Sequence, residues 1–458
     1  MGIVRVEAEL ARFSLRTRPD VDFVYFDNRT SCYRLVRRDI VQALVDGEVV
    51  VNMAGIPDPR AIVRDYLSST LHRTDRWLLP IRRPRRFLIG ALENLRLRMP
   101  AGALEQTIGR VQTLFFNKRY RALFFDAQHR RRSFVPLEGI FNGDAILDSN
   151  ATVFMPGADW NTKDPAALAE LKRRHGFLIV MVCHDLIPIK FPHFYTSRDV
   201  EVFTNYYRSS LHFVDRFICV SRRTARDLHD FARSEGQSMT DFRVERLGAN
   251  ASRPPSGVKE LAPSLKPRHY ALFVSTIEPR KNHALLYRIW LQLVSRGIPA
   301  STGFKLVFVG RPGWNTEALM SEIAADKRLA GTIVHLGDVD DVALSELYRH
   351  ASFCVYPSLY EGYGLPIVEA LSYGRAVIAS SAGSMPEVIQ DFGPCLDPTD
   401  DEAWLAQLEE WITDPKAVGI WEAKIAARFQ HPTWEEASRK YLQHASDRLR
   451  VLPSDQSP

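Results

Sequence analysis

The sequence predicts an α/β protein with two doubly wound, Rossmann-like parallel sheets. Continuous apolar runs that end in turns alternate with helical patterns from about residue 165 to residue 413, which is typical of parallel strands covered by helices on both faces. A segment rich in Pro, Ser and Lys, residues 251–268, separates two such series and is typical of a linker. A chain of 458 residues is long enough for two domains.

The C-terminal series is the more regular of the two. Its expected strands cover residues 270–275, 305–310, 332–337, 353–357 and 375–380. Its expected helices cover residues 284–294, 317–325, 343–350, 386–390 and 402–413. Ligands of such sheets bind outside the carboxyl ends of the strands, so the turns after these strands are the expected site.

The N-terminal series is shorter. It predicts strands at residues 177–183 and 216–220, flanked by helices at residues 165–174, 200–214 and 222–231. Earlier in the chain we expect strands at residues 21–26 and 122–125. The predicted domains are therefore residues 1–250 and 269–430, joined by the linker 251–268 and followed by a helix within residues 431–450.

Composition indicates a soluble, reduced protein. Hydrophobic residues make up 45% of the chain and charged residues 25%, as in ordinary globular domains. No apolar run approaches the ~20 residues that span a bilayer, and the first residues lack the apolar core of a secretory leader. The five cysteines are scattered without metal or disulfide spacing. We expect a cytoplasmic location.

Basic residues are unevenly distributed in a chain whose net charge is +6. Seven arginines are interleaved with Trp, Phe, Leu and Ile in the segment Arg76–Arg98, and Arg130–Arg132 forms a second cluster. Such a segment suits an anionic membrane surface, an acidic acceptor or nucleic acid. It is equally typical of a solvated face whose arginine stems pack on apolar neighbours. Of the binding partners, we expect the inner face of the cytoplasmic membrane or a lipid-linked acceptor, and no nucleic acid.

The most informative segment is Glu361-Gly-Tyr-Gly-Leu-Pro-Ile-Val-Glu369. It joins a buried strand to a helix start through a loop in which Gly362 and Gly364 allow a ligand to approach the backbone closely. The free N–H groups of the helix start suit a phosphate, and the two carboxylates can accept hydrogen bonds from hydroxyls. Phosphate flanked by hydroxyl-rich groups describes a nucleotide sugar.

This segment, together with the run Ser275-Thr-Ile-Glu-Pro-Arg-Lys-Asn-His283, resembles the retaining glycosyltransferases of family four. The resemblance is dense from Tyr270 to Asp414 and thin before Phe177. It implies the GT-B fold, in which two Rossmann-like domains face each other across a cleft. It also implies that the helix within residues 431–450 returns to the N-terminal domain.

The resemblance further implies roles for single residues. Lys281 is expected to neutralise the leaving phosphate, Glu361 to lie near the hydroxyls of the donor sugar, and His184 to bond a sugar hydroxyl; these three are the expected catalytic residues. Glu369 is expected to bind the ribose hydroxyls. The residues expected to bind the donor are Arg280, Gly310, Gly362, Tyr363, Gly364, Leu365 and Glu369.

The chain departs from the family pattern at two places. Many relatives carry an arginine six residues before the lysine, where this chain has Ser275, and we hypothesise that Arg280 substitutes for it. Many relatives also begin with a glycine loop, whereas residues 26–33 contain no glycine. An Asp-x-Asp pair after a strand is lacking, so we expect no metal and no cofactor besides the donor.

The implied function is retaining transfer of a hexose from a nucleotide sugar to a hydroxyl of a glycan or lipid-linked saccharide, with GDP-mannose as the favoured donor. A catalytically weak GT-B module that binds glycan or scaffolds a polysaccharide synthase is the alternative. A dehydrogenase would need Gly-x-Gly-x-x-Gly after its first strand, and neither candidate strand is followed by it. A sugar-nucleotide epimerase of the same fold stays open.

Overall fold

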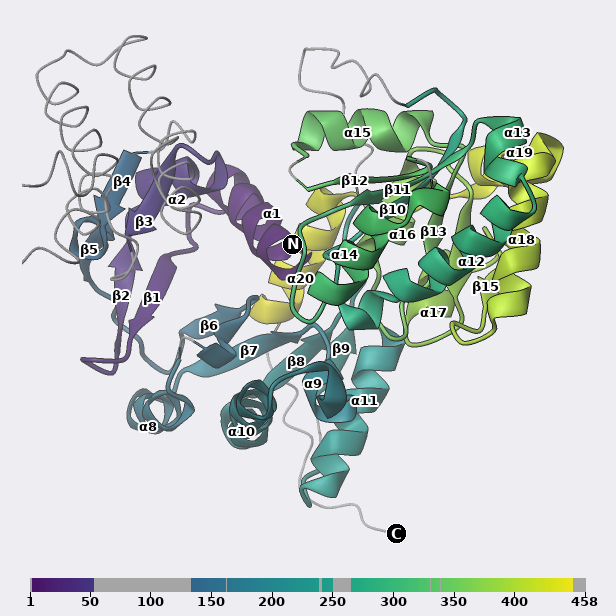
Figure 1. Ribbon diagram of the computed structural model, residues 1–458. Coiled ribbons are helices and arrows are strands. Elements are labelled where there is room, and N and C mark those ends of the chain that lie inside the picture. Colours follow the sequence, from purple (N-terminus) through teal and green to yellow (C-terminus); the bar gives the residue numbers. More distant parts are fainter. Residues whose placement is uncertain are drawn as a thin grey trace, which may run out of the picture. The chain divides into compact units, whose positions relative to one another are not determined.

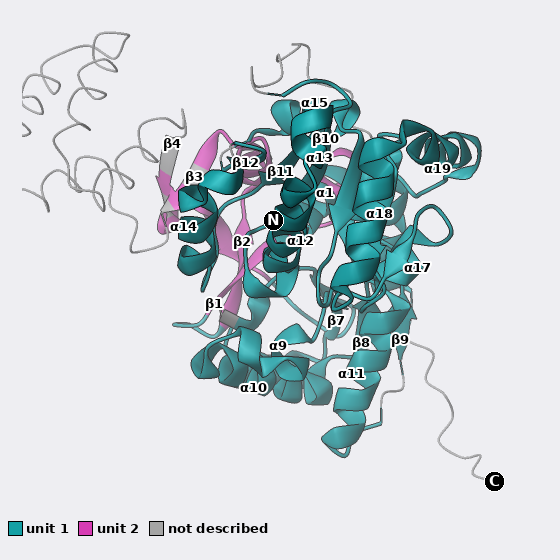
Figure 2. Ribbon diagram, turned by 45° about the vertical axis from the view of Figure 1, so that its right-hand side comes forward, with its two compact units in different colours: residues 1–13, 28–31, 146–458 teal, residues 14–27, 32–145 magenta. Residues whose placement is uncertain are grey.

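A computed structural model describes residues 2–52, 133–161, 163–238, 241–249, 265–329, 331–337 and 339–447 (Figure 1). The arginine clusters Arg76–Arg98 and Arg130–Arg132, the predicted strand at residues 122–125 and most of the predicted linker lie outside these residues. The chain divides into two compact units (Figure 2). The first and larger consists of residues 1–13, 28–31 and 146–458, and the second of residues 14–27 and 32–145. The sites discussed below all lie in the first, larger unit.

The smaller unit contains two small sheets. β1 (Phe23–Asp27), β2 (Cys32–Val36) and β5 (Phe141–Asp144) form an antiparallel sheet. β3 (Val49–Asn52) and β4 (Ser133–Pro136) pair in parallel, and α2 (Arg38–Val45) precedes β3. The predicted strand at residues 21–26 is therefore present as β1, but it belongs to an antiparallel sheet.

In the larger unit, the C-terminal lobe (residues 265–430) is built on one parallel sheet of six strands. Its strands are ordered β12-β11-β10-β13-β14-β15. They are β10 (Tyr270–Val274), β11 (Lys305–Val309), β12 (Ile333–Leu336), β13 (Phe353–Tyr356), β14 (Val377–Ser380) and β15 (Cys395–Leu396). Nearly every side chain of β10, β11, β13 and β14 is buried, as expected of strands covered on both faces.

Helices of the C-terminal lobe connect these strands and close the lobe. They are α12 (His283–Ser295), α13 (Ile298–Thr302), α14 (Glu317–Ala325), α15 (Asp341–His350), α16 (Leu365–Ser372), α17 (Met385–Ile389), α18 (Asp401–Thr413) and α19 (Pro415–Arg428), with the 3-10 turns η5 (Pro279–Lys281) and η6 (Lys327–Leu329). The predicted strands and helices of this series are all present.

The N-terminal lobe (residues 146–249) holds a second parallel sheet, in the order β6-β7-β8-β9. Its strands are β6 (Thr152–Met155), β7 (Leu178–Cys183), β8 (Arg216–Cys219) and β9 (Phe242–Val244). Its helices are α8 (Pro165–His175), α9 (Ile187–Lys190), α10 (Ser197–Phe213) and α11 (Arg222–Ser234), with the 3-10 turns η3 (Asp159–Asn161) and η4 (Pro192–Phe194). The predicted α/β class with two parallel sheets is confirmed.

The last described helix, α20 (Trp434–Ser446), packs on the N-terminal lobe. Thr433 and Glu436 form a reciprocal capping box at its start, which explains where the helix begins. The hydroxyl of Tyr441 donates to the Glu245 carbonyl at 2.7 Å, and Arg216 Nη1 donates to the His444 carbonyl at 2.6 Å. In Figure 1, α8, α10 and α11 lie on one side of this lobe's sheet and α20 on the other.

Among the described helices of the larger unit, α1, α9, α13 and α19 were not expected from the sequence. α1 (Gly2–Thr17) buries Val6, Leu10 and Phe13, and α19 follows α18 directly. In the part of the chain that the structure describes, we find no helix with both the length and the apolar character needed to cross a membrane.

Candidate active site

The strand order of the C-terminal lobe brings two loops together at the carboxyl edge of its sheet. β10 and β13 are neighbours, but the chain continues from β10 to β11 on one side and from β13 to β14 on the other. Parallel sheets bind their ligands at such a point of reversal. The loop after β10 carries Arg280 and Lys281, and the loop after β13 carries Glu361. The Leu359 N–H donates to the Arg280 carbonyl at 2.8 Å, which ties the two loops together.

The centre of this site is a buried cluster of charges around Glu361. Lys281 Nζ lies 2.5 Å from Oε1 of Glu361, and Arg280 Nη1 lies 2.9 Å from its Oε2. The hydroxyl of Tyr356 is within 3.5 Å of Lys281 Nζ and 3.4 Å of Glu361 Oε1. The side chains of all three charged residues are at most 12% exposed. Each oxygen of the carboxylate is therefore matched to one cation.

These contacts set the ionisation of the cluster. Burial by itself raises the pKa of Glu361, but the charges of Arg280 and Lys281 outweigh burial and lower that pKa to about 2. Burial and the neighbouring Arg280 lower the pKa of Lys281. Glu361 is thus held as a carboxylate of low basicity, suited to accepting hydrogen bonds from hydroxyls and poorly suited to removing protons.

Arg280 makes more contacts with protein groups than Lys281 does. Its Nη2 lies 2.5 Å from Oε1 of Glu278, and its Nη1 also donates to the Tyr360 carbonyl at 2.7 Å. Its Nε–H is buried and has no partner among the described residues. Arg280 therefore braces the loop that carries Glu361, and its buried Nε–H is left as a donor for a ligand oxygen.

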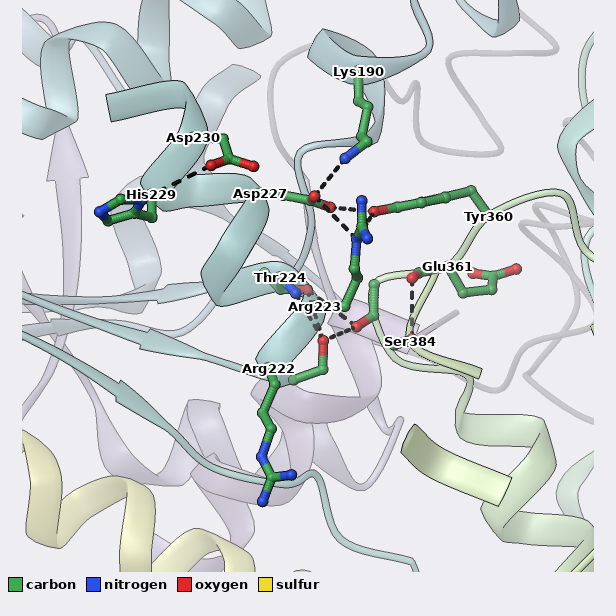
Figure 3. Close-up of polar contacts among 12 residues, drawn as sticks. Lys190, Arg222, Arg223, Thr224, Asp227, His229, Asp230, Tyr360, Glu361 and Ser384 are labelled. Atoms are coloured by element: carbon green, nitrogen blue, oxygen red, sulfur yellow. Dashed lines mark hydrogen bonds and ion pairs between the residues drawn. The ribbon is translucent and has the colours of Figure 1, made fainter. Parts of the chain in front are cut away.

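Gly362 is where the two lobes meet. A Cβ at this position would lie 2.1 Å from the His184 carbonyl oxygen, so no larger residue fits without a shift. The Gly362 carbonyl accepts hydrogen bonds from Ser221 Oγ at 2.7 Å and Thr224 Oγ1 at 3.1 Å. Ser384 Oγ bonds the carbonyl of Glu361 from the other side, at 3.0 Å (Figure 3). The loop is thereby fixed by residues of both lobes.

His184 directly follows β7 and is buried at this junction. Its Nε2 is 2.7 Å from the Pro156 carbonyl oxygen, and because a carbonyl only accepts, Nε2 carries the proton. Burial lowers the pKa of His184, which favours the neutral ring. Its Nδ1 is consequently an acceptor, and its backbone lies directly against the glycine loop.

The other predicted donor-binding residues contribute backbone more than side chain. Within the part of the chain that the structure describes, the side chain of Tyr363 makes no hydrogen bond to the charge cluster around Glu361. Its hydroxyl lies 3.3 Å from the Leu247 carbonyl oxygen and 3.2 Å from His431 Nε2. Gly364 has φ of 110°, a conformation that glycine adopts readily, and Leu365 begins α16 directly after it. Gly310 ends β11, and a Cβ there would lie 1.9 Å from the Ser275 carbonyl oxygen.

Glu369 lies on α16, one turn beyond its start, and both of its oxygens are engaged. Oε1 is 2.5 Å from Arg5 Nη1, and Oε2 accepts from the Tyr348 hydroxyl at 3.0 Å. Sequence reasoning missed Arg5, because neither its spacing nor its neighbours connect it with a residue 364 positions away. The helix α1 also contacts the N-terminal lobe, since a Cβ on Gly157 would collide with the carboxylate of Glu7.

Within the described ranges, no group of three His, Cys, Asp or Glu side chains is placed to hold a metal ion. Lys281 and Arg280 supply positive charge at the site.

Two family models match the chain. The model described as glycosyl transferases group 1 matches residues 260–427, and the model described as glycosyltransferase family 4 matches residues 160–237. The first match covers both loops of the charge cluster, and the second covers His184 and the Ser221 contact. Both halves of the site thus fall within matched segments.

Characterised relatives are also similar to the chain. It is 31% identical over 265 residues to O-antigen chain mannosyltransferase B of Escherichia coli, a match that covers 54% of this chain and 68% of that protein. It is 26% identical over 294 residues to the serotype-specific mannosyltransferase WbdA of Escherichia coli, covering 59% of this chain. The chain spans only about a third, 34%, of the length of WbdA.

Solved structures with a similar course of the chain have low sequence identity. Sucrose-phosphate synthase from Thermosynechococcus elongatus superposes with a TM-score of 0.48 at 19% identity, over 64% of this chain and 72% of that one. HepE of Anabaena, in complex with UDP and glucose, superposes with a TM-score of 0.49 at 13% identity, over 76% and 96%.

Proposed function

This chain belongs to the group 1 and family 4 glycosyltransferases of GT-B fold, and we propose that it moves a mannosyl group from a nucleotide diphosphate sugar to a hydroxyl of a growing glycan. The observation that carries the proposal is the buried pairing of Lys281 and Arg280 with Glu361 at the reversal point of the C-terminal sheet. The matched mannosyltransferases of Escherichia coli supply the choice of sugar, and GDP-mannose is the donor we propose.

In this proposal the donor diphosphate lies at the start of α16 and is neutralised by Lys281. The positive end of the α16 helix dipole and the ammonium group stabilise the charge that develops when the sugar–phosphate bond breaks. Arg280 contributes mainly by holding Glu361, and its buried Nε–H is available to a ligand oxygen. We assign this charge neutralisation to side chains, so chelators should leave the rate unchanged.

Glu361 and His184 position the sugar. A carboxylate whose pKa is about 2 is a weak base, so Glu361 accepts hydrogen bonds from donor hydroxyls without taking their protons. His184, with Nε2 donating to Pro156, presents Nδ1 as a further acceptor. We propose that the acceptor hydroxyl attacks from the face that the diphosphate leaves, so the configuration at the sugar carbon is retained.

The proposed test is a transfer assay with GDP-mannose, UDP-glucose and ADP-glucose as donors and a mannose oligosaccharide as acceptor. Product linkage is read by NMR, in which an α-linked product from the α-linked donor indicates retention. Donor binding without any transfer or hydrolysis would favour the alternative, a module that binds glycan or scaffolds a synthase. Failure of all three donors to bind would remove the proposal.

Association with a membrane remains a separate proposal, carried by the composition of Arg76–Arg98 alone. Cosedimentation with vesicles containing 30% anionic lipid, compared with neutral vesicles, tests it. Binding to the anionic vesicles that persists after the arginines of this segment are replaced would contradict the assignment.

A further inference from the structure

Four arginines surround a cavity that takes no part in the site described above. The arginine cavity has a volume of about 770 Å³ and is lined by Arg222, Arg223, Arg226, Arg246, Gly383, Pro386, Glu387 and Gln390. Residues from both lobes form its walls, with the start of α11 on one side and α17 with its preceding loop on the other. This volume is in the range of pockets that hold small-molecule ligands.

Three of the four arginines of this cavity, Arg222, Arg226 and Arg246, are exposed on its wall. Arg223 is committed, with Nε donating to the Tyr360 hydroxyl at 2.5 Å and lying 3.2 Å from Asp227 (Figure 3). In contrast, the guanidinium groups of Arg222, Arg226 and Arg246 have no hydrogen-bond or ion-pair partner among the described residues. Figure 3 shows the Arg222 side chain directed away from the Arg223 cluster. The lining residues include a single carboxylate, that of Glu387.

The local helix does not explain this arrangement. Arg222 and Arg226 are four residues apart on α11, so they share a face, and like charges at that spacing destabilise a helix. They also lie in its first turns, where the helix dipole disfavours cations. Both effects make the helix less stable, and both occur on the wall of a cavity, which indicates that the cavity binds a ligand. A bound anion offsets the repulsion between the two arginines and their unfavourable interaction with the helix dipole.

The remaining lining residues narrow the class of anion. Both oxygens of Glu387 accept from the Arg222 N–H at 3.0 Å, which fixes the carboxylate in the wall with lone pairs left for hydroxyls. Gln390 adds an amide on the same side. Among the described residues of the lining, none has an aromatic side chain on which a base could stack. Guanidinium groups beside hydroxyl acceptors match a sugar phosphate better than a nucleotide.

The arginine cavity is distinct from the Glu361 site. Gly383 lines the cavity, and a Cβ on it would lie 2.7 Å from the Glu361 carbonyl oxygen, so the glycine loop forms the partition. The Glu361 side chain is bonded to Lys281 and Arg280, neither of which lines the cavity. We propose that the arginine cavity binds the phosphate of a phosphorylated saccharide, as a second site behind the loop that carries Glu361.

The test is calorimetric titration of the full chain carrying Lys281→Ala, which weakens phosphate binding at the other site. The probes are mannose 1-phosphate, mannose linked through diphosphate to a short isoprenyl chain, inorganic pyrophosphate and free mannose. We expect the phosphorylated sugars to bind and free mannose not to bind. Tighter binding of the isoprenyl probe than of mannose 1-phosphate would identify a lipid-linked saccharide as the source, and equal or weaker binding would identify the free sugar phosphate.

Charge reversal at the cavity provides the decisive comparison. Arg226→Glu with Arg246→Glu should weaken binding of the phosphorylated sugars at least tenfold, and Arg226→Ala with Arg246→Ala serves if the reversal impairs folding. Arg233→Glu is the matched control, because it makes the same change at the far end of α11, where the side chain is 76% exposed. Binding that survives the double variants, or that is as tight for inorganic pyrophosphate as for the sugar phosphates, would overturn the proposal.

Discussion

Arg5 Nη1 lies 2.5 Å from Glu369 Oε1, although 364 positions separate the two residues in the chain. The pair joins the first helix of the protein to the helix that follows the glycine loop, and the Tyr348 hydroxyl occupies the second oxygen of the same carboxylate. Both oxygens of Glu369 therefore already have protein partners at the position where the family resemblance implies a contact with the donor ribose.

This competition predicts the effect of removing Arg5. If ribose hydroxyls must replace the guanidinium, Arg5→Ala should tighten donor binding by up to about fivefold, since partly exposed ion pairs are worth about 0.2–1 kcal/mol. Calorimetry with GDP-mannose measures the change. Arg12→Ala is the matched control, because Arg12 lies on the same helix and pairs with Glu9 at 2.9 Å. Weaker donor binding in Arg5→Ala would instead place Arg5 among the donor contacts.

Lys281→Ala should slow transfer by roughly a hundred- to a thousandfold, the usual effect of losing one group that stabilises developing charge. The effect should appear in kcat more than in KM, because the leaving-group charge is greatest in the transition state. Initial rates at saturating acceptor give both constants. Lys305→Ala, at the opposite end of the sheet at the start of β11, should behave as wild type. A rate within threefold of wild type would rule out the assigned role of Lys281.

The stability that Glu361 contributes should depend on pH in a defined direction. Its pKa is about 2 in the folded protein and about 4.3 in an unfolded chain, so its contribution is present above about pH 4.3 and is lost as the pH falls toward 2. Glu361→Gln should cost about 3 kcal/mol of unfolding free energy at pH 7, and less below pH 4. Urea unfolding at several pH values measures this, with the exposed Glu402→Gln as control. A cost that stays constant from pH 7 to pH 3 would contradict the pairing.

Gly362→Ala should disturb the junction of the lobes. The new methyl group would meet the His184 carbonyl oxygen at 2.1 Å, and relief of this overlap should cost about 1–3 kcal/mol and lower activity. Thermal unfolding and the transfer assay record the two effects. Gly419→Ala is the opposite control, because open space surrounds that glycine within α19, and the substitution should stabilise by about 0.5–1 kcal/mol. Equal stability of the two variants would mean that the loop does not touch His184.

Much of the secondary structure of the larger unit could be predicted because it depends on residues that are close together in the sequence. Apolar runs and helical periodicity define β10 to β14 and the helices between them, and turn residues mark their ends. The short strands β6, β9 and β15 escaped detection, since segments of two to four residues carry little periodic pattern. α1 was missed because its first turn has no acidic residue to mark a helix start. Only the packing of the folded chain shows that Val6, Leu10 and Phe13 form a buried face.

By itself, the sequence determined that two parallel sheets exist and that Lys281 and Glu361 follow strands at the same edge, because the positions of strands and turns follow from short-range pattern and parallel strands end at one edge of their sheet. Only the tertiary structure decided what each side chain does there. It turned Tyr363 toward His431, bound Arg280 to Glu278 and Glu361, and brought Arg5 to Glu369. Apart from Glu278, these partners lie far from each other in the chain, so their choice depends on how the lobes pack and not on any local pattern.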